Sequence, residues 1–202
     1  MFAMYDRYIK RLLDFLFSLV ALVLLAPVFV FIMAAIKLED GGPVFFLGDR
    51  IGKDCRKFRM FKFRSMVVDA PDIRNPDGST YNAKDDPRVT KVGRLLRETS
   101  LDELPQLLNV IKGEMSLVGP RASLWDSLES FTPEEMDKMK VRPGITGYCQ
   151  AYYRNDLPAR EKRLLDAWYA NNLSFWLDVQ IFFKTIGTVV RKKGLYTEHK
   201  EN

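Results

Sequence analysis

FLFSLVALVLLAPVFVFIMAAI, residues Phe15–Ile36, is a run of 22 residues without a charged side chain. Only Ser18 and Pro27 are not apolar. At about −0.3 to −0.6 kcal/mol for each Leu, Ile, Phe or Val, the run gains on the order of 5 to 9 kcal/mol by entering hydrocarbon. As one straight helix it would be about 33 Å long, which is enough to span a bilayer. The stretch therefore predicts a membrane-inserted helix.

The charges on both sides of this run argue against a simple crossing. Basic residues flank it at both ends, with Arg7, Lys10 and Arg11 before it and Lys37, Arg50, Lys53 and Arg56 after it. The positive-inside rule then places both ends in the cytoplasm. Pro27 lacks a backbone donor and clashes with the preceding turn, so it predicts a re-entrant helix-break-helix. An ordinary kinked transmembrane helix is the alternative.

The rest of the chain is long enough for one domain with its own core. We expect residues 1–40 to anchor the chain and residues 41–202 to form a compact cytoplasmic domain. Between residues 50 and 64, seven Lys or Arg residues stand against Asp54 alone. Such a patch attracts anionic lipid head groups or nucleotide phosphates. Next to a membrane segment, nucleic acid is the least expected partner, and none is predicted.

Cysteine and histidine usage narrows the chemistry. Cys55 and Cys149 lack metal-ligand spacing and are expected to be reduced thiols, while His199 is the single histidine and lies in a polar tail. A zinc site and a histidine-based mechanism are therefore not expected. Carboxylates, hydroxyls, Lys, Arg and a hard metal ion remain as the means of catalysis.

Periodicity predicts a mixed α/β fold that is mostly helical. Apolar alternation predicts a small β-hairpin, with strands at 44–47 and 57–66 around a turn at 48–54. Apolar spacing and turn signals predict a loop at 69–90 and helices at 91–97, 101–111, 133–140 and 159–171. The amphipathic stretch 173–190 fits either a surface helix at the membrane interface or a core helix, and the basic residues 191–193 after it suit anionic lipid.

The candidate chemical centre is Ser-Leu-Asp-Glu-Leu-Pro-Gln at residues 100–106. Ser100 and Glu103 have the spacing of a capping box, which is a purely structural interpretation. Pro105 weakens it, because Pro at the fifth helical position would forfeit a hydrogen bond. With Asp102 as the cap, Pro105 becomes tolerable and Asp102 and Glu103 are adjacent at a helix N-terminus. Backbone N–H groups there keep a carboxylate ionised, which suits a nucleophile or a magnesium ligand.

Four ordered motifs resemble those of bacterial sugar transferases, the small monotopic phosphoglycosyl transferases. They are Lys62-Phe-Arg-Ser-Met66, the segment 100–106, Gly113-Glu-Met-Ser-Leu-Val-Gly-Pro-Arg121 and Val141-Arg-Pro-Gly-Ile-Thr-Gly147. The resemblance extends over nearly the whole chain, and the 14 residues before the apolar run fit the family's minimal form. It departs at Ala26, where Ser commonly precedes the proline, and at Ala122, where Pro is usual.

The resemblance implies transfer of a phosphosugar from a UDP-sugar to a polyprenyl phosphate, normally undecaprenyl phosphate, with release of UMP. It implies a monotopic protein on the cytoplasmic face of the bacterial inner membrane, with lipid as a partner and a dimer as an option. Asp102 would be the nucleophile that carries the phosphosugar, with Glu103 beside it and Mg²⁺ held by both. The expected phosphate contacts are Lys62, Arg64, Arg88, Arg121 and Arg142. Loops near 69–87 and 145–160 are expected to contact the sugar.

Two other functions remain open on the residues alone. A non-catalytic peripheral membrane adaptor would use the apolar anchor, the basic patch and the amphipathic stretch 173–190. A metal-dependent nucleotide-sugar glycosyltransferase would use Asp85-Asp86 as its acidic metal-binding pair. That function is disfavoured because no repeated strand and helix units precede the pair.

Overall fold

The computed structural model describes residues 4–74, 81, 83, 85–153 and 157–190, and helices dominate it. Residues 191–193, His199 and parts of the two loops expected at the sugar lie outside the described residues. The helices and turns are η1 (Tyr5–Ile9), α2 (Lys10–Asp40), η2 (Lys53–Cys55), α3 (Lys91–Thr99), η3 (Leu101–Glu103), α4 (Gln106–Lys112), η4 (Trp125–Ser130), η5 (Glu135–Lys140), α5 (Tyr148–Tyr152), α6 (Ala159–Asn172) and α7 (Phe175–Val190). The strands are β1 (Phe45–Ile51), β2 (Lys57–Phe63), β3 (Ser116–Val118) and β4 (Gly144–Thr146).

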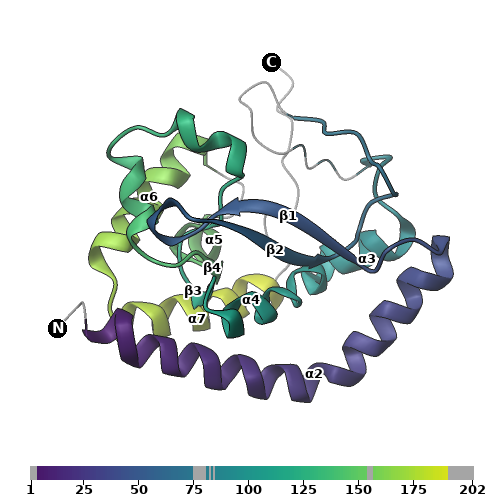
Figure 1. Cartoon of the computed structure of the whole chain (residues 1–202), viewed down its shortest axis with the longest axis horizontal. Coiled ribbons are helices and arrows are strands. Elements are labelled where there is room, and N and C mark those ends of the chain that lie inside the picture. The colour runs from purple at the N-terminus through teal and green to yellow at the C-terminus, as the bar shows by residue number, and fades with distance from the viewer. Residues whose placement is uncertain (1–3, 75–80, 82, 84, 154–156, 191–202) are drawn as a thin grey trace.

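Helix α2 contains the whole apolar run and changes direction along its length (Figure 1). The expected interruption at Pro27 is absent, because α2 continues through this residue as one helix. Pro27 is the only proline inside it, and proline is the usual cause of such a bend. The left-handed conformation of Gly41, with a φ of 71°, ends the helix.

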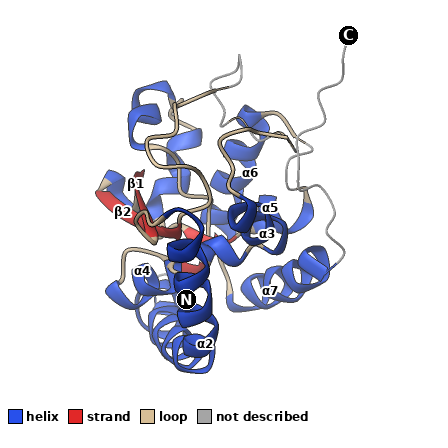
Figure 2. Ribbon diagram, turned by 90° about the vertical axis from the view of Figure 1, so that its right-hand side faces the viewer, coloured by secondary structure: helices blue, strands red, loops and turns tan. Residues whose placement is uncertain are grey.

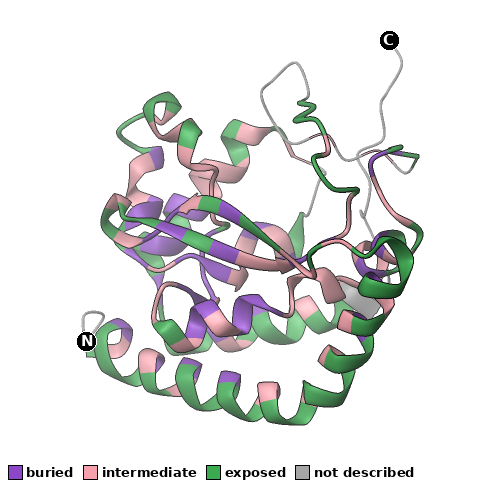
Figure 3. Cartoon of the chain, turned by 45° about the vertical axis from the view of Figure 1, so that its right-hand side comes forward, coloured by how far each residue is buried: buried purple, intermediate pink, exposed green. Residues whose placement is uncertain are grey.

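One narrow side of α2 faces the rest of the protein. Its buried residues fall four apart in two sets, Lys10, Asp14 and Ser18 in the first half and Ile32 and Ile36 in the second. Only 11% of its most apolar 18-residue window is buried, and the outer side is exposed along the helix (Figure 3). By length and composition, residues Tyr5–Asp40 are sufficient to cross a membrane.

Helix α4 lies between α2 and the β-hairpin (Figures 1 and 2). The predicted antiparallel hairpin is confirmed, with Phe45 opposite Phe63 and Ile51 opposite Lys57. The predicted turn at 48–54 is wrong, because pairing continues through Ile51, whose side chain is buried. The chain reverses instead around η2, where Asp54 and Cys55 adopt positive φ angles.

The helix predictions hold where the apolar spacing is regular and fail near prolines. Helices at 91–97 and 159–171 are confirmed as α3 and α6. The expected helix at 133–140 is the 3-10 helix η5, and the one at 101–111 is divided into η3 and α4. The parallel pair β3–β4 was not expected; it forms because Gly144 brings its backbone against that of Gly119, where a Cβ would meet the Gly119 nitrogen at 2.1 Å.

Helix α7, which covers most of residues 173–190, has one face in the core and another exposed to solvent. Asp178 and Ile181 are buried against the core. Five large apolar side chains of the same helix are exposed: Phe175, Trp176, Phe182, Phe183 and Ile186. Such an outer face suits the level of the membrane where aromatic side chains gather.

Replacing Gly93 with Ala is expected to lower stability by about 3 kcal/mol, in the upper range for overpacking. A Cβ there would lie 2.0 Å from the backbone oxygen of Ser65, so the backbone must shift. For a chain of this size the midpoint of thermal unfolding should fall by about 6 to 12 °C. The matched control is Gly187→Ala in α7, where nothing lies within 4 Å of the added methyl group. Equal midpoints for the two variants would contradict the close contact.

Candidate active site

Asp102 and Glu103 lie in η3, the short turn before α4. Leu101 and Leu104 on either side pack against the core cluster that contains Ile32 and Ile36 of α2, so the turn is held by its two leucines. Both capping interpretations, with Ser100 or with Asp102 as the helix cap, are wrong. Ser100 has a φ of 60° and its side chain makes no capping hydrogen bond, while Pro105 occupies the N-cap position of α4.

Lys62 on β2 joins the acid pair. Its Nζ lies 2.6 Å from Glu103 Oε1 and 3.9 Å from Asp102 Oδ2. Asn109 of α4 holds β2 in place, because its side chain accepts a hydrogen bond from the Phe61 N–H and donates one to the Arg59 carbonyl. The strand that carries Lys62 is thereby fixed to the helix that follows the acids.

The pKa values of the two carboxyl groups shift in opposite directions. Burial, opposed by Lys62 and reinforced by Glu103, raises the pKa of Asp102 to about 6. Burial also acts to raise the pKa of Glu103, but Lys62 and Arg121 outweigh it and hold that pKa below its ordinary value. The expectation that the site would favour ionisation is therefore correct for Glu103, while the pKa of Asp102 moves the opposite way. A carboxylate with a pKa of about 6 is more basic than an ordinary Asp and is still mostly ionised at pH 7.

Further cations surround the acids. Arg97 and Arg121 are close enough to act electrostatically on Asp102, and Arg50 is close enough to interact with Glu103 and Arg121. Burial and the neighbouring Arg121 lower the pKa of Arg50 to about 10. Within the described part of the chain, neither Arg50 nor Arg121 has a carboxylate ion pair. The arrangement leaves positive charge available to an anionic substrate.

Sequence reasoning missed the roles of Arg50 and Arg97. The sequence places Arg50 among the charges that flank the apolar run and in the basic patch, but not at the acids, because the strand that carries it is predicted as a turn. Arg97 occupies the last turn of α3, two residues before its end, and the only signal for it was its closeness in sequence to the acids.

Three of the predicted phosphate contacts lie elsewhere. Arg64 pairs with Asp40 at the end of α2 and donates to the carbonyl of Pro43. Arg88 forms a buried ion pair with Asp86. Arg142 donates a hydrogen bond to the Gly113 carbonyl, just past the opposite end of α4 from the acids. Of the five predicted residues, the structure brings Lys62 and Arg121 to the acid pair and does not bring these three.

Asp102 and Glu103 are the carboxylates that could hold a hard metal ion at this site. Among the described residues, no three acidic, cysteine or histidine side chains gather together. Asp102 and Glu103 nevertheless suit Mg²⁺, which takes one or two protein carboxylates and completes its shell with water and substrate phosphates. Asp86 does not suit a metal, because Arg88 engages both of its oxygens.

A partly buried acid pair set among cations beside a long apolar helix suits chemistry on phosphate compounds near a membrane. The family model described as "Bacterial sugar transferase" matches residues 5–192. The chain belongs to this family, as its motifs predicted.

Curated proteins are similar in sequence to this chain over nearly its whole length. The exopolysaccharide production protein ExoY of Rhizobium meliloti is 42% identical over 93% of this chain and 88% of its own. The UDP-galactose-lipid carrier transferase of Erwinia amylovora is 39% identical over 95% of this chain and 42% of its own. The UDP-N-acetylgalactosamine-undecaprenyl-phosphate N-acetylgalactosaminephosphotransferase of Aeromonas hydrophila is 41% identical over 93% of this chain and 45% of its own. The chain thus spans less than half the length of the last two relatives.

Proposed function

We propose that the protein transfers a phosphosugar from a UDP-sugar to a polyprenyl phosphate, giving a polyprenyl-diphosphate-sugar and UMP. The geometry that carries the proposal is that of Asp102, whose side chain is only 13% exposed and lies 3.9 Å from Lys62, with Arg97 and Arg121 close enough to act on it electrostatically. The names of the Erwinia and Aeromonas relatives support a UDP-sugar as donor and undecaprenyl phosphate as acceptor.

The proposed reaction has two steps. The ionised Asp102 attacks the phosphorus that carries the sugar, and the bond from that phosphorus to the bridging oxygen breaks. UMP leaves with the electron pair, and the phosphosugar remains on Asp102 as an acyl phosphate. An oxygen of the polyprenyl phosphate then attacks the same phosphorus, which releases the Asp102 carboxylate. The raised pKa suits a nucleophile, because basicity and nucleophilicity rise together.

The remaining residues stabilise charge in both steps. Attack on a diphosphate spreads negative charge over the phosphoryl oxygens and the departing UMP, so the site needs cations more than a base. Lys62 and Arg50 supply them from the hairpin, and Arg121 supplies another from the segment after β3. Glu103 is fixed by Lys62 and by a hydrogen bond with Gln106, so it orients the lysine toward the reacting group. Mg²⁺, when bound to the acid pair, would neutralise diphosphate charge.

The test is UMP release from a panel of UDP-sugars by the detergent-purified protein with magnesium and undecaprenyl phosphate. The panel includes UDP-galactose and UDP-N-acetylgalactosamine, the sugars that the relatives' names specify. Release that requires both the lipid phosphate and Asp102 supports the transferase. If folded protein releases no UMP with any sugar of the panel, the non-catalytic peripheral adaptor is favoured. An adaptor would need the apolar anchor, but it would have no need of the acid pair and its cations.

Magnesium dependence is expected from the acid pair. Excess EDTA should abolish UMP release, and added Mg²⁺ should restore it, because two carboxylates and a diphosphate repel each other without a divalent ion. Initial rates measured across a magnesium titration check this. Full activity in the chelator would exclude the metal.

We propose further that α2 is re-entrant and that the protein lies on the cytoplasmic face of the bacterial inner membrane. Basic residues at both ends of the apolar run and the bend in α2 support this placement. Cysteines introduced at Met4 and at the 88% exposed Leu38, in a chain lacking Cys55, should both react with an impermeant reagent in inverted vesicles. Labelling at only one of the two positions would mean that α2 crosses the membrane.

A further inference from the structure

A basic groove of about 690 Å³ lies at the N-terminal end of α2, and the proposed reaction does not use it. Its walls come from the first turns of the chain, the hairpin turn around η2, the end of α4 and the segment near residue 142. Seven of its lining residues are Lys or Arg and three are Asp or Glu, so positive charge is in excess.

The cations of the groove divide into two groups. Lys53, Lys57 and Lys140 form ion pairs of 2.7 to 2.8 Å with nearby aspartates. The remaining four have no ion pair with any carboxylate of the described residues; they are Arg7, Arg56, Lys112 and Arg142. Arg142 also repels the neighbouring Arg11. Unpaired cations that share one hollow favour binding of an anion.

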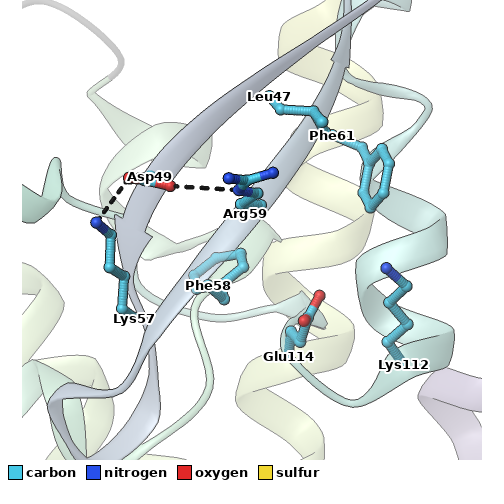
Figure 4. A pocket seen from close by; sticks show the side chains of 8 residues that line it. All are labelled: Leu47, Asp49, Lys57, Phe58, Arg59, Phe61, Lys112 and Glu114. Atoms are coloured by element: carbon cyan, nitrogen blue, oxygen red, sulfur yellow. Dashed lines mark ion pairs between the residues drawn. The ribbon is translucent and has the colours of Figure 1, made fainter.

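The same groove continues along β2 into a second hollow of about 630 Å³, whose lining contains apolar side chains among charged ones. Figure 4 shows Lys112 beneath the ring of Phe61, with the ammonium 4.5 Å from the ring centroid. Leu47 and Phe58 line this hollow too (Figure 4). The combined surface offers both cations and apolar side chains, which is what an amphiphile with an anionic head needs.

The groove lies where the chain enters the membrane and away from the acid pair. Asp6 and Arg7 in its wall come directly before exposed apolar residues of η1 and α2 such as Ile9 and Leu12. Lys112 and Gly113 lie at the end of α4 opposite the acids, and α4 is about 10 Å long. A ligand in the groove would therefore sit at the head-group level without entering the candidate active site.

We propose that this groove binds the head group of an anionic phospholipid of the surrounding bilayer. The phosphate contacts Arg7, Arg56 and Lys112, and Arg142 closes the site from the side of Gly113. This role gives a ligand to Arg142, one of the phosphate contacts predicted from the sequence.

The experiment is native mass spectrometry of the detergent-solubilised protein titrated with phosphatidylglycerol or with phosphatidylcholine of the same acyl chains. The triple variant Arg7→Gln, Arg56→Gln, Lys112→Gln removes three exposed cations and keeps Arg142, which hydrogen-bonds the backbone. The matched control, Lys91→Gln, Arg94→Gln, Arg160→Gln, removes three exposed cations outside the groove. Circular dichroism confirms that both variants are folded.

Each cation near an anionic head group contributes about fivefold in affinity. The unchanged protein is therefore expected to bind phosphatidylglycerol at least about tenfold more tightly than phosphatidylcholine. The triple variant should lose about 10- to 100-fold in phosphatidylglycerol affinity, and the control variant less than about twofold. Inorganic phosphate at millimolar concentration should not displace the lipid.

Two results would overturn the proposal. One is equal affinity of the triple variant and the unchanged protein for phosphatidylglycerol. The other is displacement of phosphatidylglycerol by equimolar undecaprenyl phosphate, which would assign the groove to the lipid acceptor. Because the measurement needs no sugar donor and no turnover, its outcome is independent of the proposed transferase activity.

Discussion

Asp102→Asn is expected to abolish UMP release, with a loss of at least about 10⁴-fold, because removal of a nucleophile removes the whole two-step route. The amide keeps the shape of the carboxylate in the turn between Leu101 and Leu104, so the fold should persist. An amide has no negative charge with which to attack phosphorus. Initial rates of UMP release, together with the unfolding midpoint of the variant, check both parts of the expectation.

The matched control is Asp85→Asn. Asp85 is exposed and belongs to the acidic pair that a metal-dependent glycosyltransferase would use. The proposed transferase should keep its rate in this variant, whereas that glycosyltransferase would lose it. Intact mass after incubation with a UDP-sugar and no lipid acceptor adds a second test. The unchanged protein should gain one phosphosugar, and a gain of the same mass by Asp102→Asn would contradict Asp102 as the nucleophile.

Lys62→Met is expected to lower kcat/KM by more than about 100-fold, the usual effect of removing one group that stabilises transition-state charge. Methionine has a similar length and no charge. The loss has two causes, because Lys62 both faces the reacting phosphate and holds Asp102 and Glu103 ionised. Lys62→Arg is the control that keeps the charge, and it should retain more activity than Lys62→Met.

The pH dependence separates these two causes. A protonated Asp102 cannot attack, so kcat/KM of the unchanged protein should fall as the pH drops through about 6. Without Lys62, the ionised form of Asp102 loses its nearest cation and its pKa rises further. The acid limb of Lys62→Met should then move to higher pH, and activity should recover partly in alkaline buffer. An unchanged acid limb would show that Lys62 does not act on Asp102.

The sequence predicted those parts of the fold that depend on local spacing. The apolar run predicted a membrane-length helix, although with a break at Pro27 that α2 does not have, and regular apolar residues predicted α3, α6 and the hairpin. The errors have long-range causes. Whether Arg50 continues a strand depends on its pairing with Phe58 across the hairpin. In the sequence, Pro143-Gly144 predicts an interruption of regular structure. In the structure Gly144 belongs to β4, because its backbone packs against that of Gly119.

The candidate site was predictable in its acids and less so in its cations. Asp102, Glu103 and Lys62 come from motifs whose order is readable along the chain. An arginine's role depends on which partner folding brings to it. Arg64 meets Asp40, 24 residues earlier in the chain, which no local signal reveals, whereas the partner of Arg88 is Asp86, only two residues earlier. Ser100 and Pro105 gave conflicting signals for where a helix begins. In the structure the short turn η3 lies between them, and α4 begins after Pro105.

Helix α2 touches the catalytic segment at both of its ends. Arg11 donates hydrogen bonds to the carbonyls of Val110 and Ile111 at the end of α4, and Ile32 and Ile36 pack in the same cluster as Leu101 and Leu104 beside the acids. The anchor and the candidate active site are therefore packed together as one unit. A chimaera that joins residues 41–202 to the anchor of another family member should work only where that anchor supplies an arginine and two apolar residues at matching positions.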